Sequence, residues 1–421
     1  MPRSFRARLA IISALAFAAR AAVALAVAPD SLTHRGDPRF FHLAANLLAD
    51  GHGYVAPLPF LVSGHVIPSA EHPPLWPALL SVFSLAGARS YTAHQLVGCA
   101  VGAATVACVG AIGRRVGGER VGLIAAVGCA VYPVFVAMDG SIMSEPLFAL
   151  CVALVLLAAF ALIDRPSLRR SALLGLALGA TVLVRGEALA LVVLLLVPAA
   201  LLVPRRRIAH VAVAAGVALL AVAPWAVRNS LTFDRAMLVS YEDGPVLAGA
   251  NCALTYHGRD LGYWRSDCLP RGHDRNFAFR SARLRRAGLR YARHHLGRLP
   301  AVEAVRLLRT FGMWQPRRHV YFAEGRMLPG RSVAVAAYWA LLALAAGGAW
   351  MLRADRARLA LLLSPAALAA LTTLVAFGYS RFRYAADAAF LVLAAVALAR
   401  AAELVPRIYA AISRRPAGTR V

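Results

Sequence analysis

The chain alternates long apolar runs with short polar stretches that are rich in arginine. A helix needs about 20 apolar residues to cross the hydrocarbon core of a membrane, and we find ten candidate runs, of which the fifth and sixth are short. They cover roughly residues 8–28, 90–113, 119–138, 144–163, 171–184, 187–203, 208–227, 332–352, 358–377 and 386–403. Residues 75–85 are apolar but too short to cross, so we expect a re-entrant or interfacial helix there. The pattern predicts an all-α polytopic membrane protein.

The amino-acid composition supports a membrane protein and argues against a nucleic-acid-binding protein. Hydrophobic residues make up 60% of the 421 residues and charged residues only 16%, which is more apolar surface than soluble domains of this size bury. The formal net charge of +26 comes from arginine, because the chain has no lysine. The arginines stand in short clusters between apolar runs, a pattern typical of membrane topology rather than of phosphate-backbone binding. We therefore expect no nucleic-acid partner.

Arginine placement also predicts which side of the membrane each loop faces. The first run follows Arg3, Arg6 and Arg8 and is interpreted as a retained signal anchor. Threading the runs from a cytoplasmic amino terminus gathers nearly all short arginine clusters, and the carboxyl terminus, on the cytoplasmic side. These clusters are Arg114–Arg115, Arg165 with Arg169–Arg170, Arg205–Arg207, Arg353 with Arg356 and Arg358, and Arg414–Arg415. Four segments then face outward from the cell membrane: residues 29–89, 139–145, 185–187 and 228–331.

One short outward loop breaks the charge rule. It carries Arg381 and Arg383 in the stretch Tyr379-Ser380-Arg381-Phe382-Arg383-Tyr384. Binding of an anion at the membrane surface would explain two arginines there, and chance placement is the alternative.

The long outward segment 228–331 offers two further features. It holds Cys252 and Cys268, which an oxidising compartment allows to form a disulfide. Residues 277–310 interleave arginines with apolar residues at helical spacing. Such a surface suits either anionic headgroups or the solvated side of an extracytoplasmic subdomain, and the sequence leaves both open.

Several motifs stand at the outward ends of the apolar runs. The first outward segment contains Gly36-Asp37-Pro38-Arg39-Phe40-Phe41 and His72-Pro73-Pro74-Leu75. Later motifs are Ser144-Glu145-Pro146-Leu147-Phe148, Arg185-Gly186-Glu187, Pro224-Trp225-Ala226-Val227-Arg228-Asn229 and Arg381-Phe382-Arg383-Tyr384. In this order they resemble the family 39 type, GT-C fold glycosyltransferases, which include protein O-mannosyltransferases and the aminoarabinose transferases of lipid A. The mannosyltransferases carry an adjacent Asp-Glu pair where this chain has Asp37 followed by Pro38.

The resemblance implies a sugar transfer, usually with inversion, from a polyprenyl-phosphate donor to a glycan, lipid or protein acceptor on the outer face. Such a transfer needs a base for the acceptor hydroxyl. Asp37 is our candidate, because we expect partial desolvation at the outer end of the first span to raise its pKa. A second interpretation is a helix cap, since Pro38 suits the first position of a helix over residues 40–49.

Two further carboxylates face the same side of the membrane. Glu145 begins the fourth run and Asp139 ends the third, so either is placed to face Asp37 across a cavity. We include Glu145 as a catalytic and Asp139 as a substrate-binding candidate. Paired carboxylates suit a divalent cation or an acceptor hydroxyl, and the sequence leaves the metal open. For Glu145, a simple helix-terminal charge is the alternative.

The departing lipid phosphate needs positive charge. Arg381 and Arg383 are the first candidates and Arg185 the second. His72 stands where relatives often have a charged residue before the Pro-Pro-Leu step, and its ring can donate to a phosphate. A polar residue at an interface turn is the simpler interpretation of His72.

We therefore expect a GT-C type helical bundle with three parts. Residues 1–227 form an amino-terminal transmembrane module with the catalytic loop 29–89, residues 228–331 form an extracytoplasmic subdomain, and residues 332–421 form the last spans. The alternative is a transporter or lipid flippase for an anionic or lipid-linked substrate. Such proteins bind their substrates near the bilayer midplane, whereas the ionisable residues of this chain gather at the outer ends of the runs.

Overall fold

The computed structural model describes residues 4–27, 36–270, 276–316 and 331–413. Within these ranges the chain is helical apart from its loops, and the one bridge between extended residues joins Val55 to Pro68. The all-α fold class is confirmed. The predicted segments that include residues 28–35, 317–330 and 414–421 lie partly outside the described residues.

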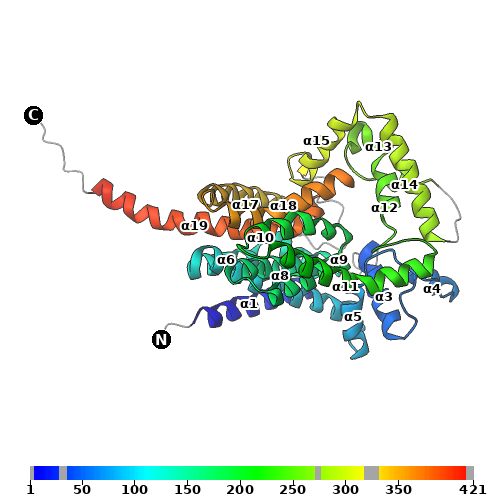
Figure 1. Cartoon of the computed structure of the whole chain (residues 1–421), viewed down its shortest axis with the longest axis horizontal. Helices are drawn as coiled ribbons and strands as arrows, with labels where there is room; N and C mark the ends of the chain where they lie inside the picture. The colour runs from blue at the N-terminus through cyan, green and yellow to red at the C-terminus, as the bar shows by residue number, and fades with distance from the viewer. Residues whose placement is uncertain (1–3, 28–35, 271–275, 317–330, 414–421) are drawn as a thin grey trace, which may run out of the picture.

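Figure 1 shows a helical bundle with a second group of helices at one of its ends. The bundle contains α1 (Phe5–Val27), α6 (Tyr91–Val131), α7 (Pro133–Asp139), α8 (Glu145–Asp164), α9 (Leu168–Val184), η1 (Gly186–Ala190), η2 (Val192–Leu196), α10 (Val197–Leu201), α11 (Arg207–Phe233), α17 (Arg331–Met351), α18 (Arg356–Val375), η5 (Ser380–Arg383) and α19 (Tyr384–Ser413). The group at its end contains α3 (Gly36–Ala49), α4 (Pro57–Ser63), α5 (Leu75–Leu85), α12 (Asp243–Ala250), α13 (Ala253–Tyr256), η3 (Gly258–Asp260), η4 (Ser266–Cys268), α14 (Phe277–His294) and α15 (Leu299–Thr310).

The spans agree with the predicted apolar runs. Seven described helices are long and apolar enough to cross a membrane. One of them, α6, contains two predicted runs, because its backbone leaves helical geometry at Gly117 and Gly118. Beyond that turn Gly122 lies against Gly113, so α6 is a hairpin of two antiparallel spans. The chain is therefore a multi-pass membrane protein.

The two short predicted spans are α9 and the segment Gly186–Leu201. That segment is irregular: it begins as the 3₁₀ helix η1, continues as the π-helix η2 and ends as α10. Such irregular turns are frequent near functional sites. Residues 75–85 form the expected short helix, α5.

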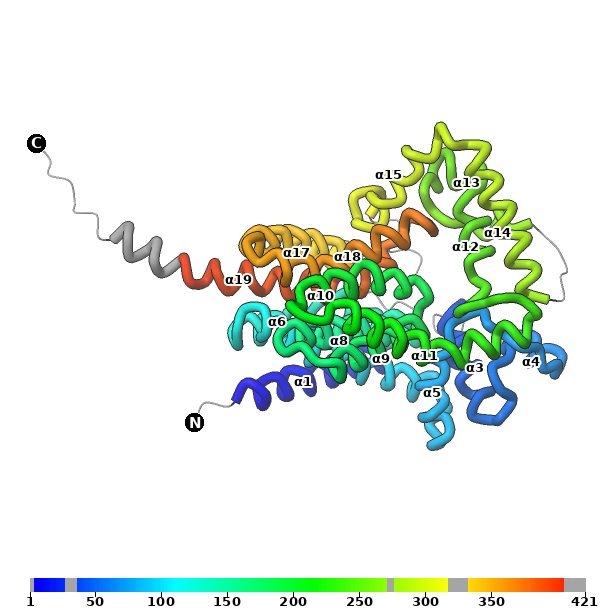
Figure 2. Tube along the Cα trace, in the orientation of Figure 1, coloured from blue at the N-terminus to red at the C-terminus, as the bar shows by residue number. Residues whose placement is uncertain are grey.

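Two of the predicted arginine clusters lie at the end of the bundle where α1 begins. Arg8 pairs with Glu119 at 3.1 Å, and Arg115 pairs with Asp164 at 2.9 Å. These contacts join the start of α1, the turn of α6 and the end of α8, which Arg165 follows. Figures 1 and 2 show α3, α12 and α14 at the opposite end. For these two clusters, the predicted separation from the chemical segments is present. Arg414 and Arg415 lie outside the described residues.

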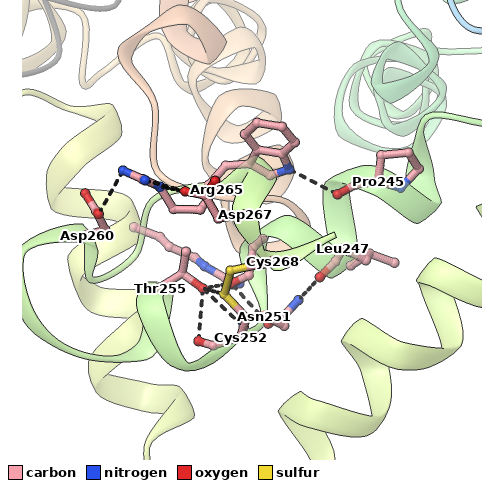
Figure 3. The surroundings of a disulfide bond; sticks show 12 residues. Pro245, Leu247, Asn251, Cys252, Thr255, Asp260, Arg265, Asp267 and Cys268 are labelled. Atoms are coloured by element: carbon pink, nitrogen blue, oxygen red, sulfur yellow. Dashed lines mark hydrogen bonds and ion pairs between the residues drawn. A yellow bond between two sulfur atoms is a disulfide. The ribbon is translucent and has the colours of Figure 1, made fainter. Parts of the chain in front are cut away.

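The helices α12 to α15 lie together at that opposite end (Figure 1). Cys252 and Cys268 form a disulfide between the start of α13 and η4, as Figure 3 shows. The prediction of a bridge is confirmed. In the same view Arg265 lies between Asp260 and Asp267 and pairs with both.

The arginine-rich stretch forms α14 and α15 rather than a single helix. α14 packs tightly on α12, because a side chain at Gly288 would come within 2.3 Å of the Leu247 carbonyl oxygen. Arg286, Arg290 and Arg293 are exposed on α14. This packing agrees with the interpretation of a solvated helix within a subdomain.

Candidate active site

A cavity of about 590 Å³ opens where the membrane bundle meets the outer helices. The starts of α3 and α8, the break before η1, the start of α12, the end of α18 and η5 all reach it. Its ionisable lining is Asp37, His72, Arg185, Glu187, Glu242, Asp243 and Arg381. Its apolar lining includes Phe41, Val184, Leu189, Ala190, Val246, Trp264, Leu371, Val375 and Phe377. The cavity therefore has charged groups beside an apolar wall.

Arg381 joins the two predicted catalytic carboxylates. Its Nη2 donates to Asp37 Oδ2 at 2.8 Å, and its Nε donates to Glu145 Oε1. The three residues come from η5, α3 and α8, which lie far apart in the sequence. The structure therefore brings together the candidate base, the second carboxylate and the candidate phosphate ligand.

Arg185 reinforces this cluster from the break between α9 and η1. Its Nη1 donates to the same Glu145 oxygen at 2.8 Å, and its Nε donates to Glu187 at 2.5 Å. The other carboxylate oxygen of Glu145, Oε2, is buried and has no hydrogen-bond partner among the described residues. Glu145 is thus held by two guanidinium groups on one oxygen.

Both carboxylates occupy the same kind of local structure. Asp37 precedes Pro38 in the first turn of α3, and Glu145 precedes Pro146 in the first turn of α8. Proline suits this position because its missing N–H has no partner there in any case. The positive end of the helix dipole favours the carboxylates. α3 begins at Gly36, so the expectation that the helix starts at residue 40, with Asp37 capping it from outside, was wrong.

His72 lies beside Asp37, with its Nε2 3.6 Å from Asp37 Oδ1. Phe40 and Phe41 hold the imidazole, with ring centroids 4.8 Å from it in each case. Tyr54 fixes the backbone here by donating to the His72 carbonyl at 2.9 Å. His72, a predicted substrate-binding residue of the loop 29–89, therefore lies beside the candidate base.

The pKa of Asp37 shifts in the opposite direction from our expectation. Burial by itself raises this pKa, but the charges of Arg381 and His72 and the hydrogen bond from Arg381 outweigh burial and lower it to about 2. The expected rise of this pKa was wrong. The sequence indicates that Asp37 is partly buried, but it does not show that Arg381, 344 positions later in the chain, contacts it. In this arrangement Asp37 is a carboxylate and a weak base.

Sequence reasoning missed two carboxylates of this region. Glu242 lines the cavity. Burial raises the pKa of Glu242 well above its usual range, and the nearby charge of Glu71 raises it further. Burial also raises the pKa of Glu71 itself. Glu71 stands next to His72 in the quoted motif, so its position was a usable signal, whereas Glu242 lies in a loop without one.

Two predicted substrate-binding residues lie away from the cavity. Asp139 is buried between α1 and α19, where Arg20 donates to it at 2.5 Å and the Tyr384 hydroxyl at 2.7 Å. Arg383 donates to the Thr310 carbonyl at 2.6 Å and stacks over Tyr338. Neither residue is part of the cavity lining. Arg381 and Arg383 therefore point to different places although they are only two positions apart in the short helix η5.

The sequence left open whether the carboxylates bind a metal ion. Among the described residues, no three or more His, Cys, Asp and Glu side chains are grouped so that they could hold one. In this structure the guanidinium of Arg381 lies between Asp37 and Glu145 and pairs with both.

Comparison with known proteins agrees with the resemblance of the motifs. Residues 71–227 match the family model of dolichyl-phosphate-mannose-protein mannosyltransferase. No curated protein sequence matches the chain.

Solved structures of the oligosaccharyltransferase AglB share the fold. The oligosaccharyltransferase AglB of Archaeoglobus fulgidus, in complex with an inhibitory peptide and a dolichol-phosphate, has a TM-score of 0.56 at 15% identity, over 99% of this chain and 52% of that one. Its apo form has a TM-score of 0.58 at 15% identity, with the same coverage. ArnT of Cupriavidus metallidurans bound to undecaprenyl phosphate has a TM-score of 0.43 at 15% identity, over 92% of this chain and 79% of that one.

The chain spans about half the length of the oligosaccharyltransferases that it matches. The common part is the helical membrane fold with its outer helices. The chain therefore has the GT-C fold of these transferases, and its residues 71–227 match the dolichyl-phosphate-mannose-protein mannosyltransferase family.

Proposed function

We propose that the protein is a membrane glycosyltransferase that moves a hexosyl or pentosyl group from a polyprenyl-phosphate donor to an acceptor outside the cytoplasm. One observation carries the proposal: Arg381 binds both Asp37 and Glu145 at the charged side of a 590 Å³ cavity whose other side is apolar. A lipid-phosphate sugar has the matching division into an anionic head and an apolar chain. The family match and the dolichol-phosphate named with AglB support the same donor class.

The apolar wall suits the polyprenyl chain. Leu371 and Val375, on the last turns of α18, line the cavity and have exposed side chains. Leu189 of η1 shares both properties. Membrane lipid would contact these exposed residues, so a polyprenyl chain can reach the cavity without leaving an apolar environment.

The charged side suits the phosphate and the reacting atoms. In an inverting single displacement, the acceptor oxygen forms a bond to the anomeric carbon while the bond from that carbon to the phosphate oxygen breaks. The electron pair of the broken bond leaves on the phosphate, where Arg381 and Arg185 stabilise the developing charge. The acceptor proton passes to Asp37.

The neighbouring residues serve these groups. Glu145 orients Arg185 and Arg381 by accepting from both. His72 lies close enough to Asp37 to orient it or to donate to the phosphate. Asp139 and Arg383 hold the surrounding helices rather than the substrate, because their partners are Arg20, Tyr384 and the Thr310 carbonyl.

We also propose that the cavity faces the outside of the cell membrane and that both termini are cytoplasmic. The arginine clusters at the end where α1 begins support this orientation under the positive-inside rule. In the proposed division, residues 1–227 supply the base, residues 228–331 cover the cavity and residues 332–421 supply Arg381.

The test is transfer of radiolabelled sugar from a panel of polyprenyl-phosphate sugars to membrane acceptors by the purified protein. We expect donor-dependent transfer by the wild type and its loss in Asp37→Asn. Equal transfer by both proteins would remove Asp37 from catalysis. No transfer from any donor by folded protein would favour the transporter or flippase.

A further inference from the structure

The charged cluster already contains more negative than positive groups. Among the described residues, Asp37, Glu145 and Glu187 are joined by ion pairs to two guanidinium groups, those of Arg185 and Arg381. With the neighbouring His72 in its neutral form, this cluster carries a formal charge of −1 before any substrate enters. An anionic phosphate would meet net repulsion there if all the present pairs remained.

The N–H groups of Arg381 that face the cluster are also in use. Its Nη2 donates to Asp37 and its Nε donates to Glu145. A phosphate oxygen that takes the N–H of Nη2 now donated to Asp37 displaces that carboxylate. Binding of the donor at this N–H therefore exchanges one ligand of Arg381 for another.

The two carboxylates differ in how firmly they are held. Glu145 has a side chain only 1% exposed, and it accepts from Arg185 as well as from Arg381. Asp37 has a side chain 25% exposed, and besides Arg381 it has His72 beside it at 3.6 Å. Asp37 is thus the carboxylate that faces the cavity and has the fewer strong partners.

From this difference we infer that the donor phosphate takes the Nη2 group of Arg381 from Asp37, while Glu145 keeps the Nε group and holds the guanidinium in place. The exchange positions the leaving group and, in the same step, releases Asp37 to accept the acceptor proton. The inference rests on the proposed function. It makes Glu145 a positioning residue and Asp37 a base that becomes active only after the donor binds.

The surroundings of Asp37 agree with this sequence of events. Without Arg381, the groups that act on Asp37 are His72 and Arg185, which lower its pKa, and burial, which raises it. Glu71 and Glu242 stand close enough for Asp37 to raise the pKa of each. The released carboxylate is therefore a stronger base than the paired one.

The experiment measures the dissociation constant of undecaprenyl phosphate for the full-length protein in detergent micelles. The variants are Asp37→Asn and Glu145→Gln. The matched control is Asp50→Asn, which changes a carboxylate just after the same helix, α3, in an exposed pair with Arg89. Thermal unfolding verifies that each variant is folded.

The exchange predicts that Asp37→Asn and Glu145→Gln change the dissociation constant in opposite directions. Asp37→Asn removes the competitor for Nη2, so the dissociation constant should fall by about fivefold or more. Glu145→Gln weakens the anchor at Nε, so the constant should rise by about tenfold. Asp50→Asn should leave it unchanged. If Asp37→Asn does not fold, Asp37→Ser carries the same prediction.

Two patterns would overturn the inference. Tighter binding by both variants would indicate general charge repulsion without exchange, and weaker binding by both would indicate that Asp37 only supports Arg381. If the wild type still transfers sugar in either case, the proposed function is retained and only the exchange of ligands at Arg381 is rejected. Failure of the wild type to bind undecaprenyl phosphate would contradict both the exchange at Arg381 and the proposed class of donor.

Discussion

At the scale of single residues, the site is governed by shared partners rather than by isolated groups. Asp37 and Glu145 both depend on Arg381, and Glu145 and Glu187 both depend on Arg185. Such sharing makes the effect of one substitution depend on the other members of the cluster. It also keeps several charges in a partly buried place that none of them would tolerate alone.

The depressed pKa of Asp37 predicts how stability depends on pH. Its pKa is lowered from 3.8 to about 2 in the folded protein, so Asp37 stabilises the fold above about pH 4 and loses that contribution as the pH falls towards 2. The shift corresponds to stability on the order of 2 kcal/mol. Thermal unfolding from pH 6 to pH 2 should show a smaller loss for Asp37→Asn than for the wild type. Parallel curves would contradict this assignment.

Arg381 should be sensitive even to a change that keeps its charge. Lysine presents one compact ammonium and cannot donate to Asp37 and Glu145 from separate edges of a planar group. We expect Arg381→Lys to lower the turnover of sugar transfer by about 100-fold. The control is Arg353→Lys, at an exposed arginine, which should retain wild-type turnover. Near-normal turnover in Arg381→Lys would show that one positive charge suffices.

At the scale of helices, close backbone approach at glycines sets how the spans pack. Small residues allow neighbouring membrane helices to come together. On α17, a side chain at Gly348 would lie 1.9 Å from the Leu393 carbonyl oxygen of α19, whereas one at Gly347 would lie 3.8 Å from Ala397. The contact between α17 and α19 therefore depends on Gly348 and not on its neighbour.

This pair of adjacent glycines provides a matched test of packing. Gly348→Ala should force α17 away from α19 and lower the stability by about 2 kcal/mol. Gly347→Ala fits the available space and should be neutral or slightly stabilising, because alanine favours helix. Thermal unfolding of the two variants in detergent measures the difference. Equal midpoints would mean that the helices adjust without cost.

At the scale of the whole molecule, the two ends of the bundle differ in chemistry. The end where α1 begins carries arginine pairs such as Arg8 with Glu119, and the opposite end carries the cavity and the subdomain with its disulfide. The positive-inside rule then gives the orientation that we propose.

Cysteine labelling tests this orientation in intact cells. Ser63 is exposed at the end of α4, and Arg120 is exposed just after the turn of α6. A membrane-impermeant maleimide should modify Ser63→Cys directly and Arg120→Cys only after the membrane is permeabilised. The wild type supplies the background, because its free cysteines are buried or half-buried. The reverse labelling pattern would invert the topology.

The sequence by itself determined the elements of this protein and the members of its site. Apolar runs specify membrane helices because the bilayer requires about 20 such residues with internally bonded backbone, and all ten runs are helical. Motifs at the ends of these runs identified Asp37, His72, Glu145, Arg185 and Arg381, which the structure brings together around one cavity.

Only the tertiary structure decided how these residues act on one another. In the folded protein Arg381 pairs with Asp37 and Glu145. Arg383 donates to the Thr310 carbonyl, and Asp139 is buried in a pair with Arg20. It also reversed the expected pKa shift of Asp37 and added Glu242 to the cavity. The physical reason is that Coulomb energies and hydrogen bonds depend on distances of a few ångströms. Helix packing fixes those distances between residues that are hundreds of positions apart.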